Sequence, residues 1–379
     1  MAGRQRRIVV KIGGSTLTTA QGTPRYKRLR PLVAEIAQLT TMGYRPVIVS
    51  SGAVPAGFGV LRWSRYPLTI PEKQAAASVG QGALMHLYQQ LFARHHLSVG
   101  QILLTRDDFS VRSRFVNIRT TMDMLLQNQV IPIVNENDTV SVEGLKVGDN
   151  DTLGALVATA VEAERYIILS DVDGLFSANP REYPDAELIR VVEQITPEIE
   201  AASGGKGSIG ATGGMRTKLS AARIAMSAGV EVVIANGETQ GILSEIVQGT
   251  ATTGTRFLAH KEPLPSKKSW IAFSSRVEGK IRIDAGAVQA VVQENKSLLA
   301  TGIVEVEGHF GAGSVVAICG PEGAELGRGI SKYTSAEIQQ FKGKRSHEIV
   351  SLIPEHLGAS PEVIHRNVMA LYAEAIVHR

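Results

Sequence analysis

The sequence has 379 residues, of which 44% are hydrophobic and 20% are charged, and its formal net charge is +4. A chain of this length exceeds what one ordinary hydrophobic core holds, so two domains are expected. The apolar fraction excludes a wholly disordered chain. The mildly basic charge is compatible with an anionic substrate or with RNA, and it is diagnostic of neither.

Features of the sequence also bear on the compartment. Cys319 is the single cysteine, so no intrachain disulfide can form and a reducing compartment is expected. The basic start, Met1–Arg7, is followed by too few apolar residues before Lys11 to form an export signal. No stretch approaches the roughly 20 apolar residues of a membrane span. We therefore expect a cytoplasmic protein without membrane contact.

The first two thirds of the chain alternate short β-branched runs with longer helical patterns. The runs predict strands at Ile8–Ile12, Pro46–Val49, Gln101–Leu104, Ile131–Val134, Tyr166–Leu169 and Glu231–Ile234. Helices are predicted at Leu29–Met42, Glu72–His95, Phe115–Asn128, Thr152–Glu162 and Gly214–Ala228. Continuous apolar strands separated by helices indicate an α/β fold, with an open, mostly parallel sheet sandwiched by helices.

The pattern changes after Ala259. Residues 260–269 are polar and contain prolines, which is typical of a linker between a first domain at 1–259 and a second at 270–355. The second domain is predicted to be small and β-rich, with strands at Lys280–Asp284, Gly302–Val306, Ser314–Ile318 and Ala324–Ile330. Residues 356–379 are expected to form a helical tail, with one helix over Pro361–Arg379.

Small and polar residues follow the strands or precede the helices of the first domain, at the sheet edge where open α/β folds bind ligands. They form clusters at Lys11–Ser15, Ser50–Ala53, Asn135–Asp138, Gly148–Thr152, Ser170–Gly174 and Gly210–Lys218. Each cluster by itself is typical of a turn or a helix cap, and the glycine motifs fit neither the dinucleotide nor the Walker pattern. Together they combine two lysines, carboxylates and carboxamides with glycine-rich loops that can present backbone N–H groups to phosphates.

The ordered set of clusters resembles the amino acid kinase family. More narrowly, it resembles the branch that phosphorylates the side-chain carboxylate of free glutamate at the start of proline biosynthesis. The resemblance runs over nearly the whole chain, and Glu278–Ile349 is similar to a PUA domain. Gly13-Gly14-Ser15 after Lys11 and the placement of Pro55 are mild departures from the family pattern. The resemblance implies ATP as co-substrate, glutamate as substrate and Mg²⁺ as the accompanying ion.

The resemblance also implies roles for individual residues. It implies catalytic roles for Lys11, Lys218 and Asp151, and a glutamate site at Ser51, Asp138 and Asn150. The implied ATP site comprises Lys11, Ser170, Asp171, Thr212, Gly213, Gly214, Met215, Arg216, Thr217 and Lys218. A glutamate side chain is already anionic at neutral pH and needs no general base, so Asp151 is expected to orient the two lysines. No protein ligand is assigned to Mg²⁺.

Two alternatives remain open at this stage. Another carboxylate kinase of the same family, acting on acetylglutamate or aspartate, would use the same loops. The PUA-like domain and the lack of a regulatory tandem argue against an aspartate kinase. An RNA-binding protein is the alternative from a different class. However, Lys267–Arg345 holds 11 Lys and Arg against 8 Asp and Glu without interleaved aromatic residues, so RNA binding is not favoured.

The family resemblance extends to partners. It implies a homo-oligomer that is inhibited by proline. It also implies functional coupling to glutamyl phosphate reductase, because an acyl phosphate is a labile product.

Overall fold

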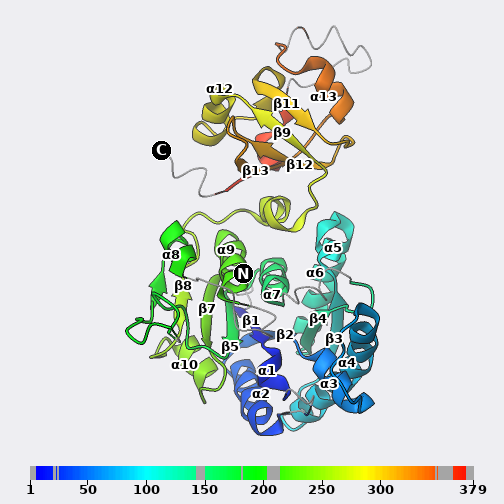
Figure 1. The fold of residues 1–379 in the computed structure, drawn as a ribbon, viewed down its shortest axis with the longest axis vertical. Helices are drawn as coiled ribbons and strands as arrows, with labels where there is room; N and C mark the ends of the chain where they lie inside the picture. The colour runs from blue at the N-terminus through cyan, green and yellow to red at the C-terminus, as the bar shows by residue number, and fades with distance from the viewer. Residues whose placement is uncertain are drawn as a thin grey trace. The chain divides into compact units, whose positions relative to one another are not determined.

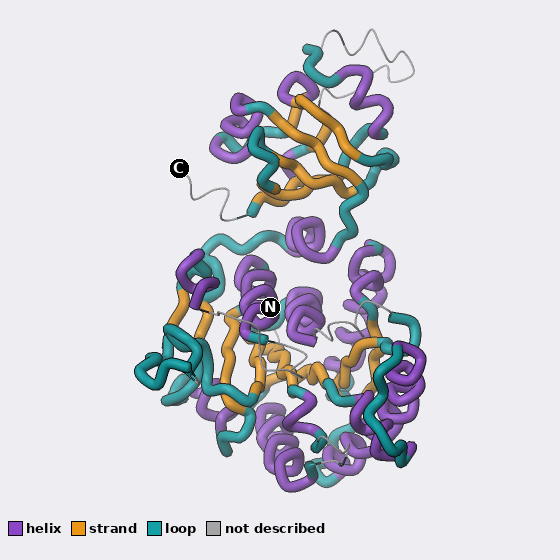
Figure 2. The backbone as a smooth tube through the Cα atoms, in the orientation of Figure 1, coloured by secondary structure: helices purple, strands orange, loops and turns teal. Residues whose placement is uncertain are grey.

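The computed structural model describes residues 6–19, 23, 25–141, 150–180, 182–202, 214–345, 348 and 362–372. The chain divides into two compact units. The first comprises Met1–Asp108 and Ser113–Pro263, and the second comprises Phe109–Arg112 and Leu264–Arg379. Figures 1 and 2 trace the two units.

An eight-stranded sheet forms the centre of the first unit, in the order β3-β4-β2-β1-β5-β7-β8-β6. Its strands are β1 (Arg6–Ile12), β2 (Tyr44–Ser50), β3 (Val99–Leu104), β4 (Ile131–Glu136), β5 (Arg165–Ser170), β6 (Val191–Val192), β7 (Glu231–Asn236) and β8 (Thr255–Phe257). The pairings from β3 to β7 are parallel, whereas β8 runs antiparallel to β7. The predicted open and mostly parallel sheet is confirmed.

Helices cover both faces of this sheet (Figures 1 and 2). They are α1 (Gly14–Leu17), α2 (Tyr26–Thr41), α3 (Ala53–Leu61), α4 (Ile70–Ala93), α5 (Arg106–Ser110), α6 (Arg112–Gln127), α7 (Asn150–Ala160), α8 (Pro197–Ala202), α9 (Met215–Ser227) and α10 (Ile242–Gln248). In the described part of the chain, no helix is long and apolar enough to cross a membrane.

Alternation along β1 decides which side chains reach the site. Ile8, Val10 and Ile12 join the hydrophobic cluster that includes side chains of α2 and α10. Successive side chains of a strand point to opposite faces, so Lys11 lies on the other face, which α7 and α9 cover (Figure 1). The lysine predicted at the end of a buried strand is therefore directed toward the N-termini of two helices.

The register of the central strands aligns their carboxyl ends. Ile12 of β1 lies opposite Ser50 of β2 and Leu169 of β5. One row earlier, Val49 of β2 pairs with Val134 of β4. The polar residues that come next along β2, β4 and β5 therefore emerge at the same edge: Ser51, Asn135 and Ser170.

The backbones of helices α3 and α4 are in direct contact with each other. A Cβ added at Gly57 would lie 1.7 Å from the Ala76 carbonyl oxygen, and one added at Gly80 would lie 1.9 Å from the Ala53 carbonyl oxygen. Only glycine permits so close an approach. Because α3 begins directly after the Ser51-Gly52 loop, this contact fixes α4 next to the carboxyl edge of the sheet.

The second unit contains a five-stranded sheet in the order β11-β9-β12-β13-β15 and a two-stranded pair, β10-β14. The strands are β9 (Gly279–Ile283), β10 (Leu298–Leu299), β11 (Ile303–Glu307), β12 (Val315–Cys319), β13 (Glu325–Ile330), β14 (Glu362–Ile364) and β15 (Met369–Leu371). Its helices are α11 (Ser266–Ser269), α12 (Ala285–Val288) and α13 (Ser335–Phe341). The predicted β-rich character of this region is confirmed.

The predicted helix over Pro361–Arg379 is wrong for the residues that the structure describes. Glu362–Ile364 pairs with β10, and Met369–Leu371 pairs with β13, with a 3₁₀ turn between them. Val363 and Ile364 are fully buried in the core of the second unit. Pairing with distant strands buries these apolar side chains, and this gain outweighs a weak local helical preference.

Candidate active site

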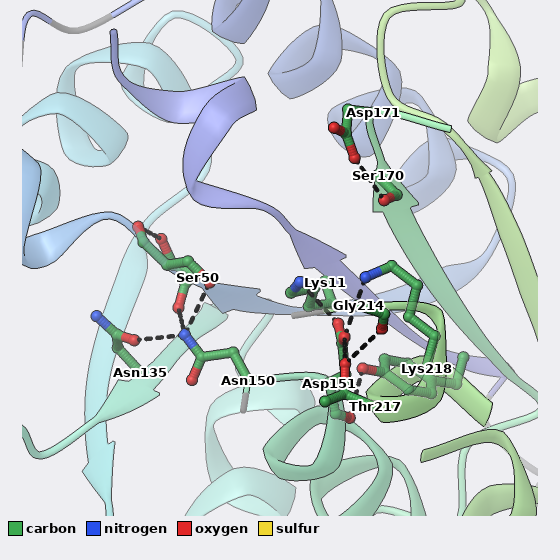
Figure 3. A network of polar contacts seen from close by, with 12 residues as sticks. Lys11, Ser50, Asn135, Asn150, Asp151, Ser170, Asp171, Gly214, Thr217 and Lys218 are labelled. Atoms are coloured by element: carbon green, nitrogen blue, oxygen red, sulfur yellow. Dashed lines mark hydrogen bonds and ion pairs between the residues drawn. The ribbon is translucent and has the colours of Figure 1, made fainter. Parts of the chain in front are cut away.

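Polar side chains from six segments of the first unit meet at the carboxyl edge of the sheet (Figure 3). Lys11 comes from β1, and Ser51 follows β2. Asn150 and Asp151 begin α7, and Lys218 lies in the first turn of α9. The ends of β4 and β5 contribute Asn135 and Ser170. The parallel arrangement of the strands brings together loops that are far apart in sequence.

A buried cluster of three charges lies at the centre of this edge. Lys11 Nζ is 2.7 Å from Asp151 Oδ1, and Lys218 Nζ is 3.1 Å from Asp151 Oδ2. Asp151 is 2% exposed and Lys218 is 4% exposed. Each carboxylate oxygen thus holds one lysine, which separates the two ammonium groups and leaves the cluster with a net positive charge.

The carboxylate of Asp151 stays ionised at neutral pH. Burial by itself would raise the pKa of Asp151, but the charges of Lys11 and Lys218 and hydrogen bonds from Lys11 and Thr217 outweigh it and lower the pKa to about 2. Such a carboxylate is a poor proton acceptor. This agrees with an orienting role for Asp151 and disfavours a role as general base.

Two further side chains hold Asp151 in place, and neither role is apparent from the sequence. The Thr217 hydroxyl lies 2.9 Å from Asp151 Oδ2 and 2.8 Å from the Gly214 carbonyl oxygen. The Tyr166 hydroxyl of β5 donates a hydrogen bond of 2.8 Å to the Asp151 carbonyl oxygen. Gly154 allows this contact, since a Cβ there would lie 2.2 Å from the Tyr166 hydroxyl oxygen.

A second cluster consists of side-chain amides. Asn150 Nδ2 lies 2.8 Å from both the Ser50 carbonyl oxygen and Ser51 Oγ, and 3.2 Å from Asn135 Oδ1. Asn135 Nδ2 donates to Gln81 Oε1 at 2.9 Å. The structure therefore brings the predicted residues Ser51 and Asn150 together. It adds Gln81 of α4, whose only signal in the sequence is one polar residue on an apolar helix face.

Asp138 lies in the turn that follows β4, and it is partly buried. Within this turn, Asn137 Oδ1 accepts from the Thr139 hydroxyl at 2.6 Å, and the Ser141 hydroxyl donates to Glu136 Oε1 at 2.7 Å. Burial and the neighbouring Glu136 carboxylate raise the pKa of Asp138 to about 7. A carboxylate in this position would gain from a cationic partner.

The predicted nucleotide residues are only partly described. Ser170 ends β5 and donates a hydrogen bond of 3.2 Å to Asp171 Oδ1, and the side chain of Asp171 is exposed (Figure 3). Gly214 precedes α9, Met215 and Thr217 are partly buried, and Arg216 is exposed. Thr212 and Gly213 lie outside the described residues.

No group of three or more His, Cys, Asp and Glu side chains among the described residues could hold a metal ion. Both oxygens of Asp151 are already occupied by lysines.

Comparison with known proteins identifies the family. The model of the amino acid kinase family matches residues 6–236, and that of the PUA domain matches residues 279–353. A glutamate 5-kinase of Caldanaerobacter subterraneus is 45% identical over 361 residues, which cover 95% of this chain and 96% of that relative. A glutamate 5-kinase of Moorella thermoacetica is 47% identical over 364 residues, which cover 96% of this chain and 95% of that relative. A glutamate 5-kinase of Deinococcus radiodurans is 46% identical over 365 residues, which cover 96% of this chain and 99% of that relative.

The resemblance that the loop clusters carried is thereby confirmed, and the matches extend through both units. A kinase uses ATP as its phosphoryl donor, which agrees with the cationic cluster at the sheet edge. The chain therefore belongs to the amino acid kinase family, and its kinase domain is followed by a PUA domain.

Proposed function

We propose that this chain transfers the γ-phosphoryl group of ATP to the side-chain carboxylate of free glutamate, giving glutamyl 5-phosphate and ADP. The observation that carries the proposal is the buried Lys11–Asp151–Lys218 cluster beside the amide cluster of Ser51, Asn135 and Asn150. The relatives named glutamate 5-kinase, which match nearly the whole chain, support the choice of substrate.

The chemistry needs cations more than it needs a base. The glutamate carboxylate has an unperturbed pKa near 4.3, so it is already a nucleophile at neutral pH. One of its oxygens forms a bond to the γ-phosphorus while the bond from that phosphorus to the ADP oxygen breaks. Lys11 and Lys218 offset the negative charge of the moving phosphoryl group, and Asp151 holds the two ammonium groups in position.

The amide cluster and Asp138 supply the other end of the substrate site. Ser51 and Asn150 offer polar groups to the glutamate main-chain end, and Asp138 offers a carboxylate to its α-ammonium. Burial makes Asp138 unfavourable as an isolated anion, so an ammonium partner would stabilise its charged form. A neutral acetylated nitrogen could not do the same.

The ATP site is proposed on the opposite side of Lys218, at Ser170, Asp171 and the loop that ends with Gly214–Lys218. Backbone N–H groups at the start of α9 face a phosphate favourably because a helix N-terminus carries partial positive charge. Mg²⁺ is proposed to arrive with ATP, held mainly by phosphate oxygens and water. It supplies further neutralisation of the phosphate charge.

A hydroxamate assay tests the proposal directly, because hydroxylamine traps an acyl phosphate. The protein is incubated with ATP, Mg²⁺ and, in turn, glutamate, aspartate and acetylglutamate. We expect trapping with glutamate and at least a hundredfold lower kcat/KM with the other two, since each misplaces or lacks the ammonium. Faster turnover of acetylglutamate would overturn the assignment of the substrate.

The metabolic setting follows from the product and from the family resemblance. Glutamyl phosphate is a labile mixed anhydride, so a reductase that consumes it must act next, as in proline biosynthesis. We extend the proposal to a homo-oligomer inhibited by proline. In this assignment the first unit carries the kinase site, and the PUA domain is not required to build it.

A further inference from the structure

Gln81 is a polar side chain inside the apolar packing of α4. It is 8% exposed, and the buried residues one turn away on either side are Ala77 and Leu84. Its Oε1 accepts a hydrogen bond from Asn135 Nδ2 at 2.9 Å. A buried polar group of this kind costs stability unless it is paired, so its presence on this face calls for a reason.

The hydrogen-bond partners of Asn135 and Asn150 fix which atom of each side-chain amide is oxygen and which is nitrogen. The backbone N–H of Glu136 donates to Asn135 Oδ1 at 2.9 Å. The Nδ2 group of Asn135 must therefore face Gln81, and there it requires an acceptor such as the amide oxygen of Gln81. The Ser50 carbonyl oxygen can only accept, so the Asn150 atom that faces it at 2.8 Å must be Nδ2.

This arrangement leaves one acceptor available. Asn150 Oδ1 is buried and has no hydrogen-bond partner among the described residues. A buried acceptor without a donor is costly, and it is matched when a ligand brings an N–H group. Glutamate has two carboxylates, which only accept, and one α-ammonium, which only donates. The ammonium is therefore the group of the substrate that complements Asn150 Oδ1.

We propose that Gln81 is a positioning residue for substrate selectivity: through Asn135 it holds the Asn150 amide with its oxygen toward the α-ammonium of glutamate. The inference rests on the proposed function and deepens it. Without the Gln81 acceptor, the buried Nδ2 group of Asn135 loses its partner and only the Glu136 N–H holds the Asn135 amide, so the contact of Asn135 Oδ1 with Asn150 Nδ2 is weakened. Removal of the Gln81 acceptor should affect only the part of the site that binds the α-ammonium, because Lys11, Asp151 and Lys218 make none of these contacts.

The test uses the full chain and two substrates that share the reacting carboxylate. Glutamate carries the α-ammonium, whereas glutarate lacks it. In Gln81→Met, which keeps the length of the side chain but removes the acceptor, we expect kcat/KM for glutamate to fall about tenfold, mainly through KM. The kcat/KM for glutarate and the KM for ATP should change less than twofold. Gln89→Met is the matched control, an exposed glutamine on the same helix, and should behave as the wild type.

Different results of this test would contradict the role of Gln81 and the proposed kinase activity. An equal loss for glutamate and glutarate would indicate a merely structural role and overturn the inference, as would an unchanged KM for glutamate. A wild-type protein that does not phosphorylate glutamate would instead overturn the proposed function. Thermal unfolding shows whether Gln81→Met is folded. If it is not, Gln81→Glu, which keeps an acceptor oxygen, should retain the preference for glutamate over glutarate, and loss of that preference would count against the inference.

Discussion

Asp151 is the residue on which β1, α7 and α9 converge, because each of its carboxylate oxygens binds a different lysine. Removing one lysine leaves the other bound to an unchanged carboxylate, so the positive charge of the cluster is lost. The first consequence should appear in the chemical step, where charge develops on the transferring phosphoryl group.

In Lys218→Met, we expect kcat to fall by about 10²–10³-fold, comparable with the loss of one preorganised donor to a transition state. The KM for glutamate should change by only a few fold, because the ammonium acts on the phosphoryl group. Steady-state kinetics with both substrates varied measures the two parameters. Lys11→Met should behave similarly, and the two losses should be non-additive if both lysines act on one group.

Lys332→Met, an exposed lysine of the second unit, is the control for loss of a positive charge and should leave kcat unchanged. A rise in KM with an unchanged kcat would reassign Lys218 to ground-state binding of the nucleotide.

If Asp138 binds the α-ammonium, the KM for glutamate should depend on pH. Its pKa is raised to about 7 by burial and by the Glu136 carboxylate, and only its ionised form attracts an ammonium. The ionised fraction grows as the pH rises, so the KM for glutamate should fall between about pH 6 and pH 8 while the KM for ATP stays nearly constant. The measurement is a series of glutamate saturation curves across this range.

Asp138→Asn preserves the size of the side chain and removes its charge. We expect it to raise the KM for glutamate by one to two orders of magnitude, roughly the 1.5–3 kcal/mol of a charged hydrogen bond, and to flatten the pH profile. A near-normal KM in this variant would remove Asp138 from the site. It would also reopen the choice between free and acetylated glutamate.

At the scale of elements, the contact between α3 and α4 connects the Ser51 loop with the helix that carries Gln81. In Gly80→Ala, the new Cβ would lie 1.9 Å from the backbone oxygen of Ala53 and 2.4 Å from the backbone nitrogen of Gly57. Backbone atoms cannot rotate away, so the helices must separate. We expect the free energy of unfolding to fall by about 1–3 kcal/mol in urea titrations.

The same helix offers a matched control. A Cβ at Gly82 would meet no atom within 4 Å, and this position is exposed. Gly82→Ala should therefore stabilise the protein by about 0.5–1 kcal/mol, since alanine loses less conformational freedom than glycine in a helix. Equal effects of the two substitutions would contradict the close packing of α3 on α4.

At the scale of the whole molecule, the described residues of both site clusters belong to the first unit. A truncated protein that ends at Pro263 should therefore keep its kcat and both KM values within a few fold of the full chain. The hydroxamate assay measures this, with circular dichroism to confirm folding. A folded truncated protein without turnover at saturating substrates would show that the second unit is needed for the site.

Much of this organisation can be predicted from local patterns. The β-branched runs and helical periodicities predict the parallel sheet, because a strand that is buried on both faces consists of consecutive apolar residues. Topology then places polar clusters such as Lys11–Ser15 and Asn135–Asp138 at one edge. Local pattern failed at Glu362–Leu371, where short apolar segments form strands by pairing with β10 and β13.

What the sequence by itself determined is therefore the sheet, its ligand-binding edge and the set of chemical groups offered there. Only the tertiary structure decided which of these groups meet. Gln81 and Asn135 are 54 residues apart, and Thr217 and Asp151 are 66 residues apart. Hydrogen bonds between such residues depend on how helices pack on the sheet, and local periodicity does not report that packing. The raised pKa of Asp138 has the same origin, because burial and a neighbouring charge are properties of the folded chain.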